Sequence, residues 1–138
     1  MASHTHQRIL SLIVKKMIHE GYEIVAFDGD YTTLEKIPVN IPFKVLRHRP
    51  DVIGITRDMS KLCIGEAKTS SDLRSTRTKE EFIDFALIGD HVYKEVNLII
   101  GAPLSSKKVL FKVIENLNLS SNKNIQYLFV PEALLSNV

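Results

Sequence analysis

Apolar and polar residues follow two different periods along this chain, and each period predicts one kind of element. Over residues 5–20 the apolar side chains recur at helical spacing, and Gly21 supplies a stop. Residues 22–27 are a short, mainly apolar run and predict a strand. The chain is therefore expected to begin with a helix followed by a strand.

Residues 49–68 contain two further apolar runs, which are separated by a polar break at residues 57–60. This pattern predicts two strands joined by a tight turn. The preceding segment, 31–48, has no clear period because prolines interrupt it, and only residues 43–46 have the pattern of a short edge strand. The hairpin is therefore the best-defined feature of the first half.

The length of the turn decides which charged side chains of the hairpin meet. If Asp58 and Met59 form a two-residue loop, Asp51 lies directly opposite Glu66, and Lys68 shares the same face. A four-residue loop places Asp51 opposite Lys68 instead, and a three-residue loop puts the two acids on opposite faces. Only loops of even length bring the three side chains together.

The hairpin is followed by a polar segment and then by a second helix. Residues 69–78 are rich in Ser and Thr and predict a loop. Thr78 is the expected N-cap, because Glu81 follows three residues later in the capping-box arrangement. The helix after it is expected to bury Phe82 and Phe85.

The last third of the chain alternates strand, helix and strand. Residues 96–102 are almost wholly apolar and predict a strand buried on both faces. A helix carries apolar residues over 109–117, and a final strand covers 125–130. The element order predicts a single α/β domain over residues 1–138, with a central mixed β-sheet flanked by helices.

Composition supports a globular domain and limits the cellular compartments in which it is expected. The chain has 138 residues, of which 44% are hydrophobic and 25% charged. We expect no membrane association, because no apolar run approaches the ~20 residues of a membrane span. The single cysteine, Cys63, excludes an internal disulfide and fits core packing in a reducing compartment, so a cytoplasmic location is expected.

Charge is distributed unevenly, although the net charge is only +2. Residues 44–79 contain nine basic and four acidic residues, a balance of +5, so the remainder carries −3. This asymmetry predicts a positive field around the hairpin, as binding to a phosphate backbone requires. The candidates for phosphate contact are Arg49, Arg74, Arg77 and Lys79.

The pair Pro50-Asp51 and the sequence Glu66-Ala67-Lys68 resemble the motif of the PD-(D/E)XK nuclease superfamily. The order helix, strand, hairpin, helix, strand is similar as well. The resemblance implies a restriction-endonuclease-like core, α-β-β-β-α-β, followed here by a C-terminal helix and strand. In size the chain is similar to archaeal Holliday junction resolvases. The implied function is that of a metal-dependent endonuclease that hydrolyses DNA phosphodiester bonds.

The resemblance also implies a role for each matching residue. Asp51, Glu66 and the backbone carbonyl of Ala67 would bind Mg²⁺ or Mn²⁺. Lys68 would position or help to deprotonate the attacking water and stabilise charge in the transition state. A homodimer is expected, because a nuclease this small must cut both strands of DNA.

Two departures from the family pattern leave alternatives open. Several branches carry an acidic ligand early in the first helix, whereas residues 4–17 contain no Asp or Glu, which favours one metal over two. Many relatives have a glutamine where this chain has Glu80 and Glu81. A catalytically inactive module that binds nucleic acid or acts as a scaffold is the main alternative. A small-ligand domain is disfavoured because a glycine-rich phosphate loop is missing. His4 and His6 are expected to lie in a frayed terminus.

Overall fold

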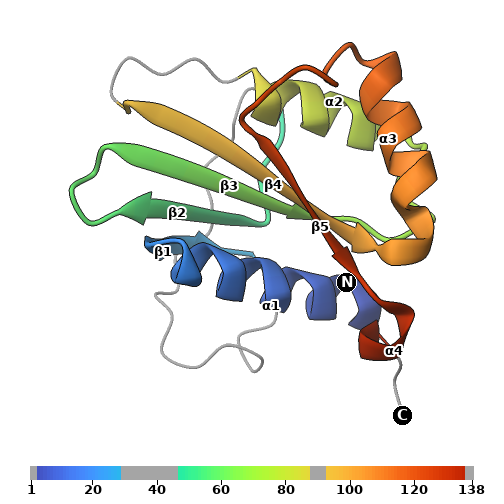
Figure 1. Cartoon of the computed structure of the whole chain (residues 1–138), viewed down its shortest axis with the longest axis horizontal. Helices are drawn as coiled ribbons and strands as arrows, with labels where there is room; N and C mark the ends of the chain where they lie inside the picture. Colours follow the sequence, from blue (N-terminus) through green and yellow to red (C-terminus); the bar gives the residue numbers. More distant parts are fainter. Residues whose placement is uncertain (1–2, 29–46, 88–92, 136–138) are drawn as a thin grey trace.

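The computed structural model describes residues 3–28, 47–87 and 93–135 (Figure 1). A single turn of 3₁₀-helix, Leu104–Ser106, directly precedes the third helix. The elements in chain order are α1 (His4–His19), β1 (Tyr22–Phe27), β2 (Val52–Thr56), β3 (Lys61–Ala67), α2 (Thr76–Ala86), β4 (Glu95–Pro103), α3 (Lys107–Asn116), β5 (Ile125–Val130) and α4 (Glu132–Leu135).

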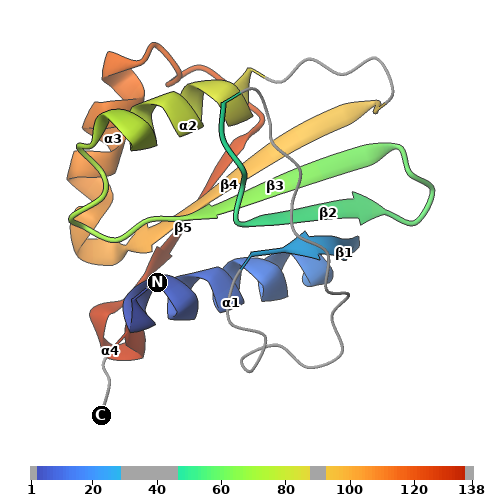
Figure 2. The ribbon, with the colours of Figure 1, turned by 180° about the vertical axis from the view of Figure 1, so that it is seen from behind.

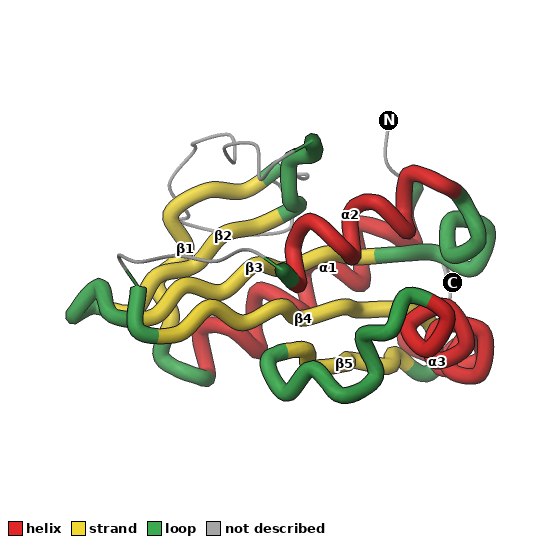
Figure 3. Tube along the Cα trace, turned by 90° about the horizontal axis from the view of Figure 1, so that it is seen from above, coloured by secondary structure: helices red, strands yellow, loops and turns green. Residues whose placement is uncertain are grey.

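The strands form one mixed sheet in the order β1-β2-β3-β4-β5, which Figure 3 shows from above. Strands β1, β2 and β3 pair antiparallel, whereas β3, β4 and β5 pair parallel. Helix α1 covers one face of the sheet, and α2 and α3 cover the other (Figures 1 and 2). The predicted α/β class and the mixed sheet flanked by helices are therefore confirmed.

The hairpin of β2 and β3 has the register expected for a two-residue loop. Val52 pairs with Gly65 and Ile55 with Leu62. Residues 57–60 connect the strands, and the Met59 N–H donates to the Thr56 carbonyl. Met59 has a φ of 62°, a left-handed conformation that short hairpin turns require. This is the register that places Asp51 opposite Glu66.

Helix α1 packs unusually close to the sheet because glycines lie beneath it. A Cβ atom added to Gly65 would lie 2.7 Å from Ile13 Cγ2 and 2.5 Å from Val52 Cγ1. One added to Gly101 would lie 2.7 Å from both Ile9 and Ile13. Side chains would collide at these distances, so the glycines set how near the helix comes. The first turn of α1 is thereby held against the end of the sheet where the charged residues lie.

The start of α2 differs from the prediction. The helix begins at Thr76, and Ser75 is its N-cap, because the Ser75 hydroxyl accepts a hydrogen bond from the Thr78 N–H. The assignment of Thr78 as N-cap was wrong, and Arg77 lies in the helix rather than in the loop. Glu81 is consequently not a capping-box residue, and its side chain is free to turn inward.

Both chain ends are more ordered than expected within the described residues. Ser3 caps α1 by accepting a hydrogen bond from the His6 N–H, so the expectation of a frayed terminus at His6 was wrong. The short α4 after Pro131 was not predicted. The possible edge strand at 43–46 lies outside the described residues.

Candidate functional site

Asp51 and Glu66 lie side by side where β2 begins and β3 ends. The Asp51 N–H donates a hydrogen bond of 3.1 Å to Glu66 Oε2. The Ala67 N–H donates one of 2.9 Å to Asp51 Oδ2. The N–H of Asp28, just past β1, donates to the Asp51 carbonyl. Asp51 is thus held by both neighbouring strands, and two carboxylates meet on one sheet face.

Lys68 contacts Glu66 of this pair and also a third carboxylate, that of Glu81. Its Nζ lies 3.3 Å from Glu66 Oε1 and 2.6 Å from Glu81 Oε1 on α2. Only 7% of Lys68, 2% of Glu66 and 3% of Glu81 is exposed. A single ammonium group therefore bridges two buried carboxylates, one from the sheet and one from the helix above it.

Burial and charge shift the pKa values of this group strongly. The pKa of Glu66 is raised well above its usual range, mainly because the side chain is buried and next because Asp51 lies beside it. Burial lowers the pKa of Lys68, but the charges of Glu66 and Glu81 outweigh burial and raise it overall. Lys68 therefore remains an ammonium ion at neutral pH, and the carboxylates outnumber it.

Helix α1 contributes a histidine to the same site. His6 Nε2 lies 3.2 Å from Asp51 Oδ2. Burial lowers the pKa of His6, but the hydrogen bond and charge of Asp51 outweigh it and raise the pKa. Within the described ranges, His6 Nδ1 is the one buried side-chain nitrogen or oxygen without a hydrogen-bond partner. His6 thus fixes the Asp51 carboxylate from the opposite side of the sheet to α2.

The donor atoms around Asp51 match part of a divalent-cation site. The Lys68 N–H donates to the carbonyl of Gly101 on β4, so the Ala67 carbonyl of the same planar peptide points the other way, towards β2. Two carboxylates, one carbonyl and water form an oxygen set of the kind that Mg²⁺ binds. In the described part of the chain, however, no three His, Cys, Asp or Glu side chains are grouped to hold a metal. The residues fit an ion that is also held by water or substrate.

The predicted positive field is only partly present at this end of the sheet. Arg57 and Lys61 lie at the hairpin tip, about 20 Å from Asp51 at roughly 3.3 Å per strand residue. Arg47 is paired with Asp84 at 2.7 Å and with Glu80 at 3.4 Å. The charge count alone therefore overstated the positive field near Asp51, because the strands place Arg57 and Lys61 at the opposite end of the sheet. Lys44 lies outside the described residues.

The four residues predicted to contact phosphate are all exposed. Arg49 precedes Asp51 by two positions, and Arg74 lies in the loop between Lys68 and α2. Arg77 and Lys79 follow in the first turn of α2. None of the four forms an ion pair with a described carboxylate. Their charges are therefore not neutralised by a described side chain.

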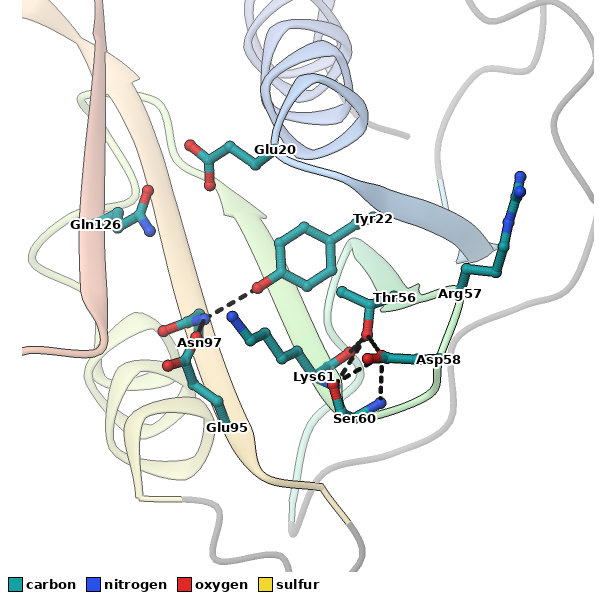
Figure 4. Close-up of a pocket in the computed structure, with 10 residues that line it drawn as sticks. All are labelled: Glu20, Tyr22, Thr56, Arg57, Asp58, Ser60, Lys61, Glu95, Asn97 and Gln126. Atoms are coloured by element: carbon teal, nitrogen blue, oxygen red, sulfur yellow. Dashed lines mark hydrogen bonds between the residues drawn. The ribbon is translucent and has the colours of Figure 1, made fainter.

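A second polar cavity lies at the opposite end of the sheet (Figure 4). It has a volume of about 530 Å³ and lies next to the hairpin tip and the end of α1. Inside it the Asn97 amide donates to the Tyr22 hydroxyl at 3.0 Å and to Glu95 at 2.7 Å. Acidic and basic side chains both line this cavity, and it contains none of the predicted site residues.

Cys63 has the inert role that was expected from its position in an apolar run. The side chain is fully buried beneath α1. Burial raises the pKa of its thiol to about 12, so the thiolate is absent at neutral pH. A nucleophilic role for Cys63 is therefore excluded in the folded protein.

Sequence reasoning missed two residues of this site. Glu81 was assigned to a capping box, although its place three residues after Thr78 also matches a buried helix face that includes Phe82 and Phe85. His6 was assigned to a frayed end, although Ser3 before it is a good N-cap residue. In both cases the missing signal was three-dimensional, because the partners are Lys68 and Asp51, far away in sequence.

Comparisons with known proteins add no assignment. No family model matches the chain, and neither the curated proteins nor the solved structures include a match. Among the helices in the described ranges, none is long and apolar enough to cross a membrane.

Proposed function

We propose that this protein is a metal-dependent nuclease that hydrolyses DNA phosphodiester bonds and is similar to the PD-(D/E)XK nucleases. The observation that carries the proposal is the meeting of Asp51, Glu66 and Lys68 on one sheet face. A β-strand of ordinary geometry presents Glu66 and Lys68 together, and the hairpin register adds Asp51. The element order from α1 to β4 resembles the order expected for the nuclease core, which supports the same proposal.

The metal would be held by Asp51, Glu66 and the Ala67 carbonyl. When bound, Mg²⁺ or Mn²⁺ supplies a Lewis acid for the phosphate and lowers the pKa of a water ligand. Its charge would also offset the burial and repulsion that raise the pKa of Glu66. His6 would act as a positioning residue, because its ring orients the Asp51 carboxylate.

Lys68 would act as a fixed positive charge rather than as a base. Its raised pKa keeps the ammonium group protonated, and the low exposure of the site strengthens its field. Negative charge that develops on the phosphate oxygens would be stabilised by this group. Glu81 positions it, since the 2.6 Å contact fixes where the ammonium group points.

The proposal is tested with DNA cleavage assays. Purified protein is incubated with plasmid, linear, single-stranded and four-way-junction DNA in the presence of Mg²⁺, Mn²⁺ or EDTA. We expect cleavage with either metal, none with EDTA, and a loss of roughly 10²–10³-fold in Asp51→Asn and Lys68→Met. Lys61→Met is the matched control, because it removes the same charge at the other end of β3. Cleavage that persists in both site variants would overturn the proposal.

A nucleic-acid-binding module without turnover is the second candidate. The first helix brings His6, rather than an acidic side chain, next to Asp51, which favours this candidate. Wild-type protein that binds DNA and cleaves none of the four substrates with either metal would establish this candidate instead. Dimer formation remains a prediction.

A further inference from the structure

A groove between the start of α2 and the outer side of α3 gathers positive charge. Its volume is about 390 Å³, and its floor is apolar. The two helices lie next to each other on the same side of the sheet (Figures 1 and 2). The lining residues are Arg74, Lys79, Val109, Lys112, Val113 and Asn116.

The three cations of this groove come from three separate elements. Arg74 belongs to the loop before α2, Lys79 to the first turns of α2, and Lys112 to the middle of α3. All three side chains are exposed, and no ion pair joins any of them to a carboxylate of the described residues. Among the described residues, none that lines the groove is acidic. Three like charges therefore line it without a described carboxylate beside them.

Acids near Arg74 and Lys79 in sequence are engaged elsewhere, and Glu115, three residues after Lys112 on α3, is exposed but is not among the described residues that line the groove. Asp72 accepts hydrogen bonds from the backbone and hydroxyl of Thr69. Glu80 lies 3.0 Å from His48 and also pairs with Arg47. The cavity at the hairpin tip differs, because acidic and basic side chains line it together. Of these two cavities in the described part of the chain, the groove between α2 and α3 has the one-sided charge that favours an anion.

We propose that this groove binds a backbone phosphate of the DNA substrate, away from the bond that is cleaved. This rests on the proposed function for the identity of the ligand. Arg74 follows Lys68 by six residues, so the two lie at most about 20 Å apart, less than one turn of a DNA duplex. A duplex that presents one phosphate to Lys68 can therefore present another to the groove. Lys112 then becomes a DNA contact on α3, a helix from which sequence predicted none.

The test uses a fluorescein-labelled 20-base-pair duplex, with binding measured by fluorescence anisotropy in EDTA so that no cleavage occurs. The variant carries Arg74→Gln, Lys79→Gln and Lys112→Gln together. Its matched control carries Lys15→Gln, Lys94→Gln and Lys123→Gln, three exposed lysines outside the groove. Both proteins lose three positive charges, so net charge is equal and only position differs.

Each phosphate contact contributes about −0.9 to the slope of log K against log salt concentration. We expect the slope of the groove variant to be less steep than that of the control by about 2.7. Its DNA affinity near 0.15 M salt should be at least roughly tenfold weaker than that of the control. Equal slopes and equal affinities in the two variants would overturn the proposal. Circular dichroism establishes that both variants are folded.

A second arm distinguishes backbone phosphate from free phosphate. Binding is repeated with 10 mM inorganic phosphate at constant ionic strength, and we expect no change in the difference between variant and control. If inorganic phosphate abolishes the difference in DNA affinity between the groove variant and the control, the groove is a site for free anions, and the proposal is overturned. If the protein cleaves no DNA but the groove variant still has a smaller salt slope than the control, only the hydrolase assignment is contradicted. Nuclease activity and phosphate binding in the groove are therefore tested separately.

Discussion

The two ends of the central sheet differ in how deeply their charged side chains are buried and in how those charges are compensated. Where β3 ends, Glu66 and Lys68 are almost completely buried, and carboxylates outnumber the ammonium group. At the hairpin tip, Asp58 is exposed and satisfied by its own turn. A polar cavity lies at the hairpin tip, whereas the strongly raised pKa of Glu66 and the buried charge contacts of Lys68 are at the other end.

This contrast concerns how each end of the sheet compensates its polar groups. Burying several charges is costly unless each one has a partner, so a protein retains such a group where it serves a purpose. The polar cavity near Tyr22 and Asn97 satisfies its own hydrogen bonds. The group around Lys68 instead holds two buried carboxyl groups against one ammonium group, and a bound cation would favour their ionised forms.

The largest expected difference in stability is between two lysines of one strand. Lys68→Met leaves Glu66 and Glu81 buried without a cation and should cost about 3–5 kcal/mol at pH 8. Lys61→Met removes the same group from a partly exposed side chain and should cost less than about 0.5 kcal/mol. Urea unfolding measures both values, and equal losses would contradict the contrast.

The loss of stability in Lys68→Met should also depend on pH, and the titration of Glu66 determines whether it grows or shrinks as pH rises. The folded-state pKa of Glu66 lies above its unfolded value, and removing Lys68 raises it further. A group of this kind contributes stability that is fully present below the unfolded pKa and is lost as pH rises through the folded one. The variant should therefore be less impaired at pH 5 than at pH 8. A loss that is larger at pH 5 would contradict this assignment.

A smaller effect is expected from the close packing that brings α1 to the site. Gly65→Ala forces a methyl group against Ile13 and Val52 and should cost about 1–3 kcal/mol. Val52→Ala removes the atom that lies 2.5 Å from the added Cβ. The double variant should consequently be more stable than the sum of the single losses predicts. Strict additivity in urea unfolding would show that the contact does not limit the packing.

The smallest effect is expected at the hairpin tip. Hydrogen bonds from the Ser60 hydroxyl and N–H, and then from Thr56, lower the pKa of Asp58 to about 2. Such a group stabilises the fold above its unfolded pKa, and that stability is lost as pH falls through about 2. Asp58→Asn should lower the melting temperature slightly at pH 7, and the difference should disappear between pH 4 and pH 2. A difference that persists at pH 2 would contradict the role of the charge.

Local patterns were sufficient to predict most of the fold. The strands at 22–27 and 125–130 have the bounds that alternation and stop residues indicated. Counting residues between two apolar runs limited the hairpin to a few registers, and the observed register is the one that places Asp51 opposite Glu66. These features depend on neighbours in sequence, which is why sequence alone was enough.

The remaining features depend on contacts between distant segments. Glu81 and His6 reach the site only because α2 and α1 pack on opposite faces at the same end of the sheet. The charge count around the hairpin failed for the same reason, since Arg57 and Lys61 are near in sequence but lie at the far end of the strands. Close packing of α1 over Gly65 is equally invisible to local patterns.

The central claim, that Asp51 and Glu66 bind a divalent cation, is tested most directly by calorimetric titration with Mn²⁺. Wild-type protein should bind one ion per chain at neutral pH and release protons, because the cation displaces the proton that the raised pKa of Glu66 favours. Asp51→Asn should abolish this binding, and Glu95→Gln, at the other end of the sheet, should leave it unchanged. The absence of binding at millimolar Mn²⁺, or binding that survives in Asp51→Asn, would contradict the claim.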